Sequence, residues 1–260
     1  MWLVFLGLAA LLVFLVLKFK KKFKSLSPLG TITVCTGAVK TGKTTLAVHL
    51  ALKSYKKACF AHKIRALFDK KVEKPLLYSN IPLAVPYVPV TTDMLLRKVR
   101  IVPKSVVLLD EASLVADSML IKDNVINTQL LKFFKLFGHS SHGGSLIVDT
   151  QSISDLHYAI KRCIANYCYI QRTYRFLPFF LCMDVIEQRY SDDGTVISSQ
   201  TEDVDKNLRR VLVPKSVWKK FDTYCYSILT DSLPMYKKEV VADTLKTVQI
   251  PSFRDWGDIK

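Results

Sequence analysis

Residues 37–44 read GAVKTGKT and directly follow the apolar run TITVC at residues 31–35. This pattern is typical of a phosphate-binding loop that closes a buried strand and opens a helix. Glycines let backbone N–H groups approach phosphates, Lys43 can reach the β- and γ-oxygens, and the Thr44 hydroxyl can ligate Mg²⁺. The sequence therefore predicts a site for ATP with Mg²⁺. The expected nucleotide-binding residues are Gly37, Ala38, Val39, Lys40, Thr41, Gly42, Lys43, Thr44 and Thr45.

A pair of acids follows a second apolar run. Residues 106–109 read VVLL and are followed by Asp110 and Glu111. Because ligands of open α/β sheets bind at the carboxyl ends of the strands, both carboxylates are expected beside the phosphate loop. We expect Asp110 to hold Mg²⁺ together with Thr44, and Glu111 to accept a proton from the attacking water as general base. The alternative is an acidic surface pair after a core strand.

The remaining segments predict a parallel sheet in an α/β fold. Strand-like runs at residues 76–79, 106–109, 145–149 and 167–172 alternate with helical patterns at 43–57, 129–137 and 154–163. This alternation favours parallel strands covered by helices on both faces. After it, residues 179–189 and 195–199 flank the turn signal SDDG, which predicts an antiparallel hairpin at the edge of the sheet.

The segment 76–79 between the phosphate loop and the Asp-Glu pair resembles the additional-strand class of P-loop ATPases. In that class, the strand that corresponds to residues 145–149 lies between the strands that correspond to residues 31–35 and 106–109. The resemblance implies that Gln151, which ends the run IVDTQ, sits between Lys43 and Glu111 and hydrogen-bonds the γ-phosphate.

The amino-terminal segment predicts a membrane anchor. Residues 2–17 are uninterrupted apolar sequence, and Lys18, Lys20, Lys21, Lys22 and Lys24 follow. A helix of this length spans about 26 Å, close to the hydrocarbon core of a bilayer. A buried helix in a soluble domain is the alternative, but this segment is apolar on every side, and a domain of this size could not cover all of them. A cleaved signal peptide would carry a basic start and a small-residue cleavage site, which are missing. The lysines favour an N-out, C-in orientation in the inner membrane, with the rest of the chain cytoplasmic.

Length and charge define three expected regions in the 260 residues: an anchor with its lysines at 1–24, an ATPase domain at 25–200 and a basic extension at 201–260. The net charge is +16; without the five lysines, 33 basic and 22 acidic residues leave +11. This excess suits anionic lipid or nucleic acid. Basic pairs interleaved with Trp218, Tyr224 and Tyr236 suit single-stranded DNA. Membrane contact or packing against the core are the alternatives for these residues.

Six cysteines without a CxxC pair predict no metal site beyond Mg²⁺.

Four separated motifs together resemble the zonular occludens toxin (Zot) family, which includes the assembly ATPases of filamentous phages. The motifs are GAVKTGKT at 37–44, YSNIPL at 78–83, VVLLDEAS at 106–113 and HGGSLIVDTQ at 142–151. The resemblance implies an oligomeric ATPase with an FtsK- and HerA-like core. Such an enzyme moves single-stranded phage DNA through the inner membrane, with coat or assembly proteins as partners. It supports the roles of Lys43, Thr44, Asp110, Glu111 and Gln151.

The resemblance also implies an arginine supplied by a neighbouring subunit, which stabilises transition-state charge in such rings. Arg162, Arg172 and Arg97 are candidates, and we favour Arg162 because it ends the helix that follows Gln151.

The membrane topology departs from the family. Better-known members carry their spanning segment after the ATPase domain and before an extracytoplasmic domain, whereas here the apolar segment comes first. We therefore expect no exported domain and do not extend the resemblance to an outer-membrane channel or to toxin activity. A host with a single membrane would explain the departure. The alternative functions are a DNA-transfer or partition ATPase, a nucleotide-binding membrane scaffold and a small-molecule kinase.

Overall fold

The computed structural model describes residues 26, 32–69, 71–97, 99–112, 124–153, 156, 158–188 and 208–221. Within these ranges, no helix combines the length and the apolar character needed to cross a bilayer. The expected anchor, the SDDG turn with the strand after it, and most of the carboxyl-terminal extension lie outside the described residues.

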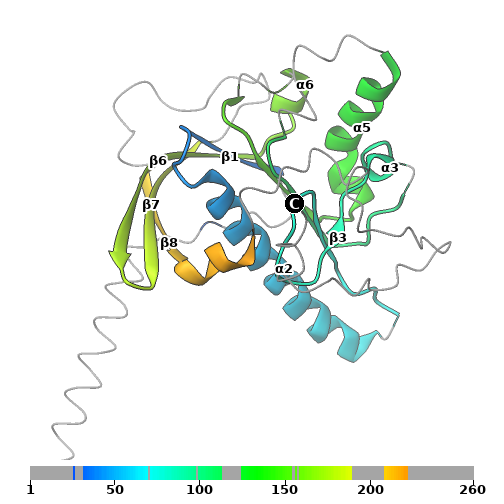
Figure 1. The fold of residues 1–260 in the computed structure, drawn as a ribbon. Coiled ribbons are helices and arrows are strands. Elements are labelled where there is room, and N and C mark those ends of the chain that lie inside the picture. The colour runs from blue at the N-terminus through cyan, green and yellow to red at the C-terminus, as the bar shows by residue number, and fades with distance from the viewer. Residues whose placement is uncertain are drawn as a thin grey trace, which may run out of the picture.

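A single mixed sheet forms the centre of the fold (Figure 1). Its first six strands are parallel and its last two are antiparallel to their neighbours. In spatial order the strands are β3 (Val88–Pro89), β2 (Leu77–Ser79), β4 (Val106–Leu109), β5 (Ser145–Asp149), β1 (Ile32–Gly37), β6 (Asn166–Leu177), β7 (Phe180–Gln188) and β8 (Leu208–Pro214).

The order of the central strands confirms the prediction made from the additional-strand resemblance. β5 lies between β1 and β4, with Val148 opposite Val34 on one side and opposite Leu109 on the other. Because all three strands run parallel, their carboxyl ends meet at one edge of the sheet. The phosphate loop, Asp110 and the residues after β5 therefore share that edge.

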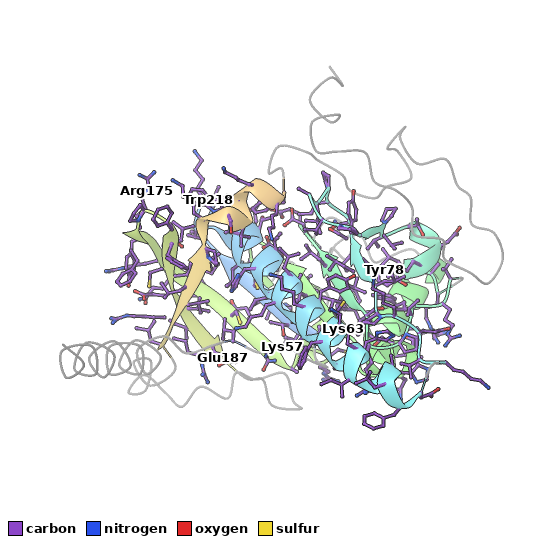
Figure 2. The ribbon with its side chains drawn as sticks, turned by 90° about the horizontal axis from the view of Figure 1, so that it is seen from below. Lys57, Lys63, Tyr78, Arg175, Glu187 and Trp218 are labelled. Atoms are coloured by element: carbon purple, nitrogen blue, oxygen red, sulfur yellow. The ribbon has the colours of Figure 1, made fainter. Side chains whose placement is uncertain are left out.

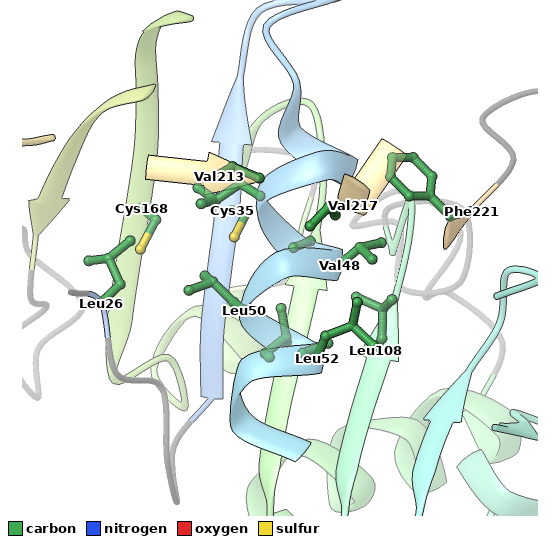
Figure 3. Close-up of a cluster of buried hydrophobic side chains, with 14 of the residues drawn as sticks. Leu26, Cys35, Val48, Leu50, Leu52, Leu108, Cys168, Val213, Val217 and Phe221 are labelled. Atoms are coloured by element: carbon green, nitrogen blue, oxygen red, sulfur yellow. The ribbon is translucent and has the colours of Figure 1, made fainter. Parts of the chain in front are cut away.

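Helices cover both faces of the sheet, as expected from the alternating pattern (Figure 1). The helical elements are α2 (Lys43–Phe68), α3 (Thr92–Leu95), α5 (Asn124–Ser140), α6 (Tyr158–Lys161) and the 3₁₀ helix η2 (Lys215–Lys220). On the face of α2, Val48 and Leu50 pack with Cys35 of β1, Leu108 of β4 and Val213 of β8 (Figure 3). On the other face, Phe133, Phe134 and Phe137 of α5 pack edge-on against one another and against the sheet.

Two helices are longer than the sequence pattern predicted. α2 ends at Phe68 rather than at residue 57, and α5 runs from Asn124 to Ser140 rather than over 129–137. Residues 58–68 contain no glycine or proline, and six of the eleven are alanine, lysine, arginine or leucine, which are good helix formers. Of the helix expected at 154–163, the described residues contain the single turn α6.

The antiparallel edge is present as predicted, and its described hairpin is one that the sequence pattern did not predict. β6 and β7 are joined at Pro178 and Phe179, and Leu177 pairs with Phe180. β8 then pairs with β7, so residues 208–214, which we assigned to a separate extension, belong to the central sheet. Residues beyond β8 hold this edge to the loop after β2, because the Ala84 amide donates to the Lys220 carbonyl.

Candidate nucleotide-binding site

The phosphate loop joins β1 to α2 and is closed by its own hydrogen bonds. The Thr41 amide and hydroxyl both donate to the Ala38 carbonyl, at 3.3 and 2.7 Å. Gly42 has φ of 88°, a left-handed conformation that favours glycine. A Cβ at Gly37 would lie 2.8 Å from the Thr41 hydroxyl, so this position too requires the absence of a side chain.

The amino-terminal turn of α2 is built to receive an anion. No side chain caps this end, and no acid lies in its first turn. The first backbone bond of the helix runs from the Leu46 amide to the Gly42 carbonyl, at 3.0 Å. The amides of Lys43, Thr44 and Thr45 precede it and point out of the helix, where the helix dipole favours a phosphate.

The antiparallel hairpin supports the loop from the side. The Thr173 hydroxyl of β6 donates a 2.6 Å hydrogen bond to the Thr41 carbonyl. Met183 of β7 lies behind Gly42, because a Cβ built there would be 3.1 Å from the methionine methyl group. Strands β6 and β7 thus fix the conformation of the loop.

Two buried carboxylates meet the helix end at Thr44. The Thr44 hydroxyl donates to Oδ2 of Asp149 at 2.9 Å, and Asp149, the last residue of β5, is fully buried. Burial raises the pKa of Asp149 well above its usual value, and the charge of Asp110 raises it further. Burial also raises the pKa of Asp110. Lys43 lies close enough to lower both pKa values in part.

These groups fit a divalent cation. Both Asp110 and Asp149 have a buried Oδ1 atom without a hydrogen-bond partner. Two neighbouring carboxylates and a hydroxyl are oxygen ligands of the kind that Mg²⁺ takes beside a bound triphosphate. A cation between them would offset the cost of burying two negative charges. The structure thus brings together Lys43, Thr44 and Asp110, as predicted, and adds Asp149.

Asn80 is a second residue that sequence reasoning missed. Its side-chain amide donates to the Asp110 carbonyl at 2.8 Å, and its carbonyl oxygen accepts from the Asp110 amide at 2.7 Å. Asn80 itself is buried just after β2, and its two hydrogen bonds fix the backbone of Asp110. Asn80 lies in the YSNIPL motif, and Asp149 lies in IVDTQ. Their positions at strand ends were the signal that could have identified them.

The roles of Glu111 and Gln151 stay predictions, but both residues lie at the correct edge of the sheet. Glu111 follows Asp110 in a left-handed turn with φ of 47° and is half-buried. The turn is tied to β5, since the Ala112 amide donates to the Asp149 carbonyl at 2.8 Å. Gln151 is exposed two residues after Asp149.

Two of the three candidate arginines lie at opposite edges of the sheet. Arg162 is exposed and follows α6, and the Ala165 amide after it donates to the Ile32 carbonyl at the start of β1. This is the edge opposite the phosphate loop of the same chain, so Arg162 could act only on a neighbouring subunit. Arg172 lies beside Thr173, at the edge that carries the loop.

No protein-family model matches the chain, and no curated protein sequence matches it significantly. Solved structures do match. A zonular occludens toxin domain is among them. That structure, the N-terminal domain from Neisseria meningitidis, shares 14% identity and has a TM-score of 0.47, and the alignment covers 75% of this chain and 100% of that one.

A viral genome packaging NTPase and a flagellar accessory protein also match. The genome packaging NTPase B204 of Sulfolobus turreted icosahedral virus 2, in complex with sulfate, has 18% identity and a TM-score of 0.38 over 59% of this chain and 78% of that one. The flagellar accessory protein FlaH of Methanocaldococcus jannaschii has 16% identity and a TM-score of 0.37 over 75% and 89%.

Proposed function

We propose that this protein is a membrane-anchored, Mg²⁺-dependent ATPase that drives filamentous phage assembly and extrudes single-stranded DNA through the inner membrane. The observation that carries the ATPase part is the convergence of Thr44, Asp110 and Asp149 beside Lys43. A phosphate loop alone would support nucleotide binding. The buried carboxylate pair adds the means to hold the cation that a triphosphate brings.

Each of these residues has a separate role in ATP hydrolysis. Loop amides and Lys43 bind the phosphates of ATP, and Thr44 with Asp110 and Asp149 would hold Mg²⁺. When bound, Mg²⁺ neutralises charge on the β- and γ-phosphate oxygens. Glu111 takes the proton of the attacking water, and Gln151 hydrogen-bonds the γ-phosphate. Arg162 of a neighbouring subunit completes the site in a homo-oligomer.

The DNA and membrane parts of the proposal rest on the sequence. The motifs resemble those of phage assembly ATPases, the body is basic, and residues 2–17 are apolar. The fold adds a surface that suits single strands, because Tyr169, Arg172 and Tyr174 are exposed along one face of β6. Rings that stack on bases beside cations that contact phosphates are common in single-strand binding.

Purified full-length protein tests the proposal through its ATPase rate. We expect single-stranded DNA to raise the rate severalfold and moderate salt to abolish the increase, since phosphate contacts are salt-sensitive. Stimulation by duplex DNA instead would indicate a DNA-transfer or partition ATPase of the FtsK and HerA type. Hydrolysis that responds to neither form of DNA would contradict the extrusion function.

A further inference from the structure

The carboxyl-terminal half of α2 exposes an apolar stripe. Phe60, Ile64, Leu67 and Phe68, called the α2 stripe below, are 66, 46, 81 and 87% exposed. Residues of a helix turn by about 100° each, so these four side chains fall within about 100° of one another on one side of the helix. Large apolar side chains gathered on an exposed helix face mark an interaction site more often than a stray exposure.

Among the described residues, this face of α2 stays exposed. On the opposite side of the helix, Nε2 of His62 lies 3.1 Å from the Val72 carbonyl, so the segment after α2 packs there. Figure 1 shows this half of α2, in lighter blue, projecting away from the sheet. The α2 stripe is therefore not covered by the described part of the chain.

The surroundings of the α2 stripe are basic. No acidic residue occurs anywhere in α2, whereas Lys56, Lys57, Lys63 and Arg65 lie on its second half and Lys53 lies just before it. By helical geometry, Lys53 and Lys57 share the side of the stripe, and Lys56 and Lys63 lie along one border of it. Figure 2 labels Lys57 and Lys63 along α2. An apolar strip bordered by cations is the pattern of helices that lie in the surface of an anionic bilayer.

The amino-terminal segment reaches the body at the same helix. Leu26 is buried, and its carbonyl accepts a 3.2 Å hydrogen bond from Nζ of Lys53. Leu26 comes two residues after Lys24, the last lysine of the basic run that follows the apolar segment. Phe60 lies seven residues beyond Lys53, about 10 Å along the helix and on nearly the same side. The α2 stripe thus begins close to the point where the chain would leave the membrane.

We propose that the α2 stripe is a second membrane contact, which docks the carboxyl-terminal half of α2 against anionic lipid headgroups. The occupant is lipid rather than the same helix of a second copy, because α2 carries lysines and an arginine but no acid and would repel itself. The inference uses the anchor of the proposed function only to bring α2 to the bilayer.

This contact has a consequence for the nucleotide site. The helix that carries the α2 stripe begins at Lys43, directly after the phosphate loop. A helix of this length is a stiff rod of about 39 Å. Lipid contact at one end therefore fixes the direction in which the phosphate loop faces relative to the bilayer.

Full-length protein reconstituted in vesicles tests the contact. An environment-sensitive fluorophore is attached at L67C or, as the matched control, at F179C, in a background with Cys59, Cys163 and Cys225 changed to serine. Phe179 is likewise an exposed apolar residue, 73% accessible, but lies on the turn between β6 and β7. Lipids with nitroxide headgroups serve as quenchers, in phosphatidylcholine alone or mixed equally with phosphatidylglycerol.

With phosphatidylglycerol, we expect the label at residue 67 to be quenched at least about threefold more than the label at residue 179. The difference should shrink in phosphatidylcholine, and the double variant K56E/K63E should reduce it while K56R/K63R preserves it. ATP hydrolysis by each labelled protein verifies folding.

Equal quenching at the two positions would overturn the inference. The inference would also be overturned if the label at residue 67 were shielded from water to the same degree in both lipid mixtures and more strongly at higher protein concentration. That result would indicate contact with a second copy. Extraction at alkaline pH tests the anchor separately. A chain that is extracted but still shows lipid-dependent quenching at residue 67 would contradict the anchor and support the α2 contact.

Discussion

The Thr44 hydroxyl donates a 2.9 Å hydrogen bond to Oδ2 of Asp149, which joins the phosphate loop to the end of β5. Asp110, on the next strand, brings a second buried carboxylate to the same place. The sheet order makes this possible, because β5 lies between β1 and β4. Two carboxylates that close together are costly without a cation, and this cost gives the first prediction.

Replacing Asp149 with asparagine should stabilise the metal-free protein by about 1–3 kcal/mol, since it removes a buried charge beside Asp110. Asp149 has a raised pKa in the folded state, so its contribution to stability is full below its unfolded pKa and falls as the pH rises through the folded value. The gain should therefore grow toward neutral pH. Thermal unfolding in EDTA measures it. In Mg²⁺ with a non-hydrolysable ATP analogue, the order should reverse, because D149N loses a metal ligand; a stabilisation that persists there would contradict the assignment.

Replacing Asn80 with alanine should lower kcat about tenfold or more and destabilise the fold by about 1–3 kcal/mol. The substitution removes both hydrogen bonds that hold the Asp110 backbone and leaves buried groups without partners. Steady-state ATPase assays and urea unfolding give the two quantities. Q171A, on the exposed side of β6, is the control and should match the wild type. Unchanged kcat in N80A would mean that Asn80 does not position Asp110.

Replacing Thr173 with valine should raise the KM for ATP about five- to tenfold with little change in kcat. Valine keeps the shape but removes the 2.6 Å hydrogen bond to the Thr41 carbonyl, which costs about 1 kcal/mol in loop organisation. T173S keeps the hydroxyl and should behave as the wild type. If T173V and T173S were indistinguishable, the hairpin would have no part in shaping the loop.

His49 of α2 should make the protein sensitive to acid. Burial, helped by Lys53 and Lys56, lowers the pKa of His49 from 6.5 to about 4. A depressed pKa contributes stability above pH 6.5 that is lost as the pH falls through about 4, and the loss amounts to about 2–3 kcal/mol. The free energy of unfolding in urea at pH 7 and pH 4.5 measures it. H49Q should flatten this part of the profile, and an unchanged profile would argue against a buried neutral imidazole.

The part of the fold that forms the candidate nucleotide site was predictable because its signals are local. The glycines and Lys43 mark the phosphate loop, and Asp110 after VVLL marks a neighbouring strand end. Asp149 and Asn80 were harder to recognise, because a single polar residue after a strand is common in any sheet. Only the strand order shows that the two residues converge on Thr44 and Asp110.

The turn between β6 and β7 and the end of α2 were missed for physical reasons. The apolar run around Pro178 hides a turn of only two residues, whereas the stronger turn signal SDDG, at residues 191–194, lies outside the described residues. The second half of α2 faces lipid or water on one side and a loop on the other. Its apolar pattern therefore does not continue the pattern of the first half, and a reading based on core-facing residues ends the helix too early.

The general-base role of Glu111 is the central claim about chemistry, and single-turnover hydrolysis of ATP by E111Q tests it most directly. Glutamine keeps the size of the side chain but cannot accept the proton of the attacking water. We predict that E111Q binds ATP with Mg²⁺ as tightly as the wild type and hydrolyses it about 10²- to 10⁴-fold more slowly. Hydrolysis by E111Q at the wild-type rate would contradict the proposed mechanism.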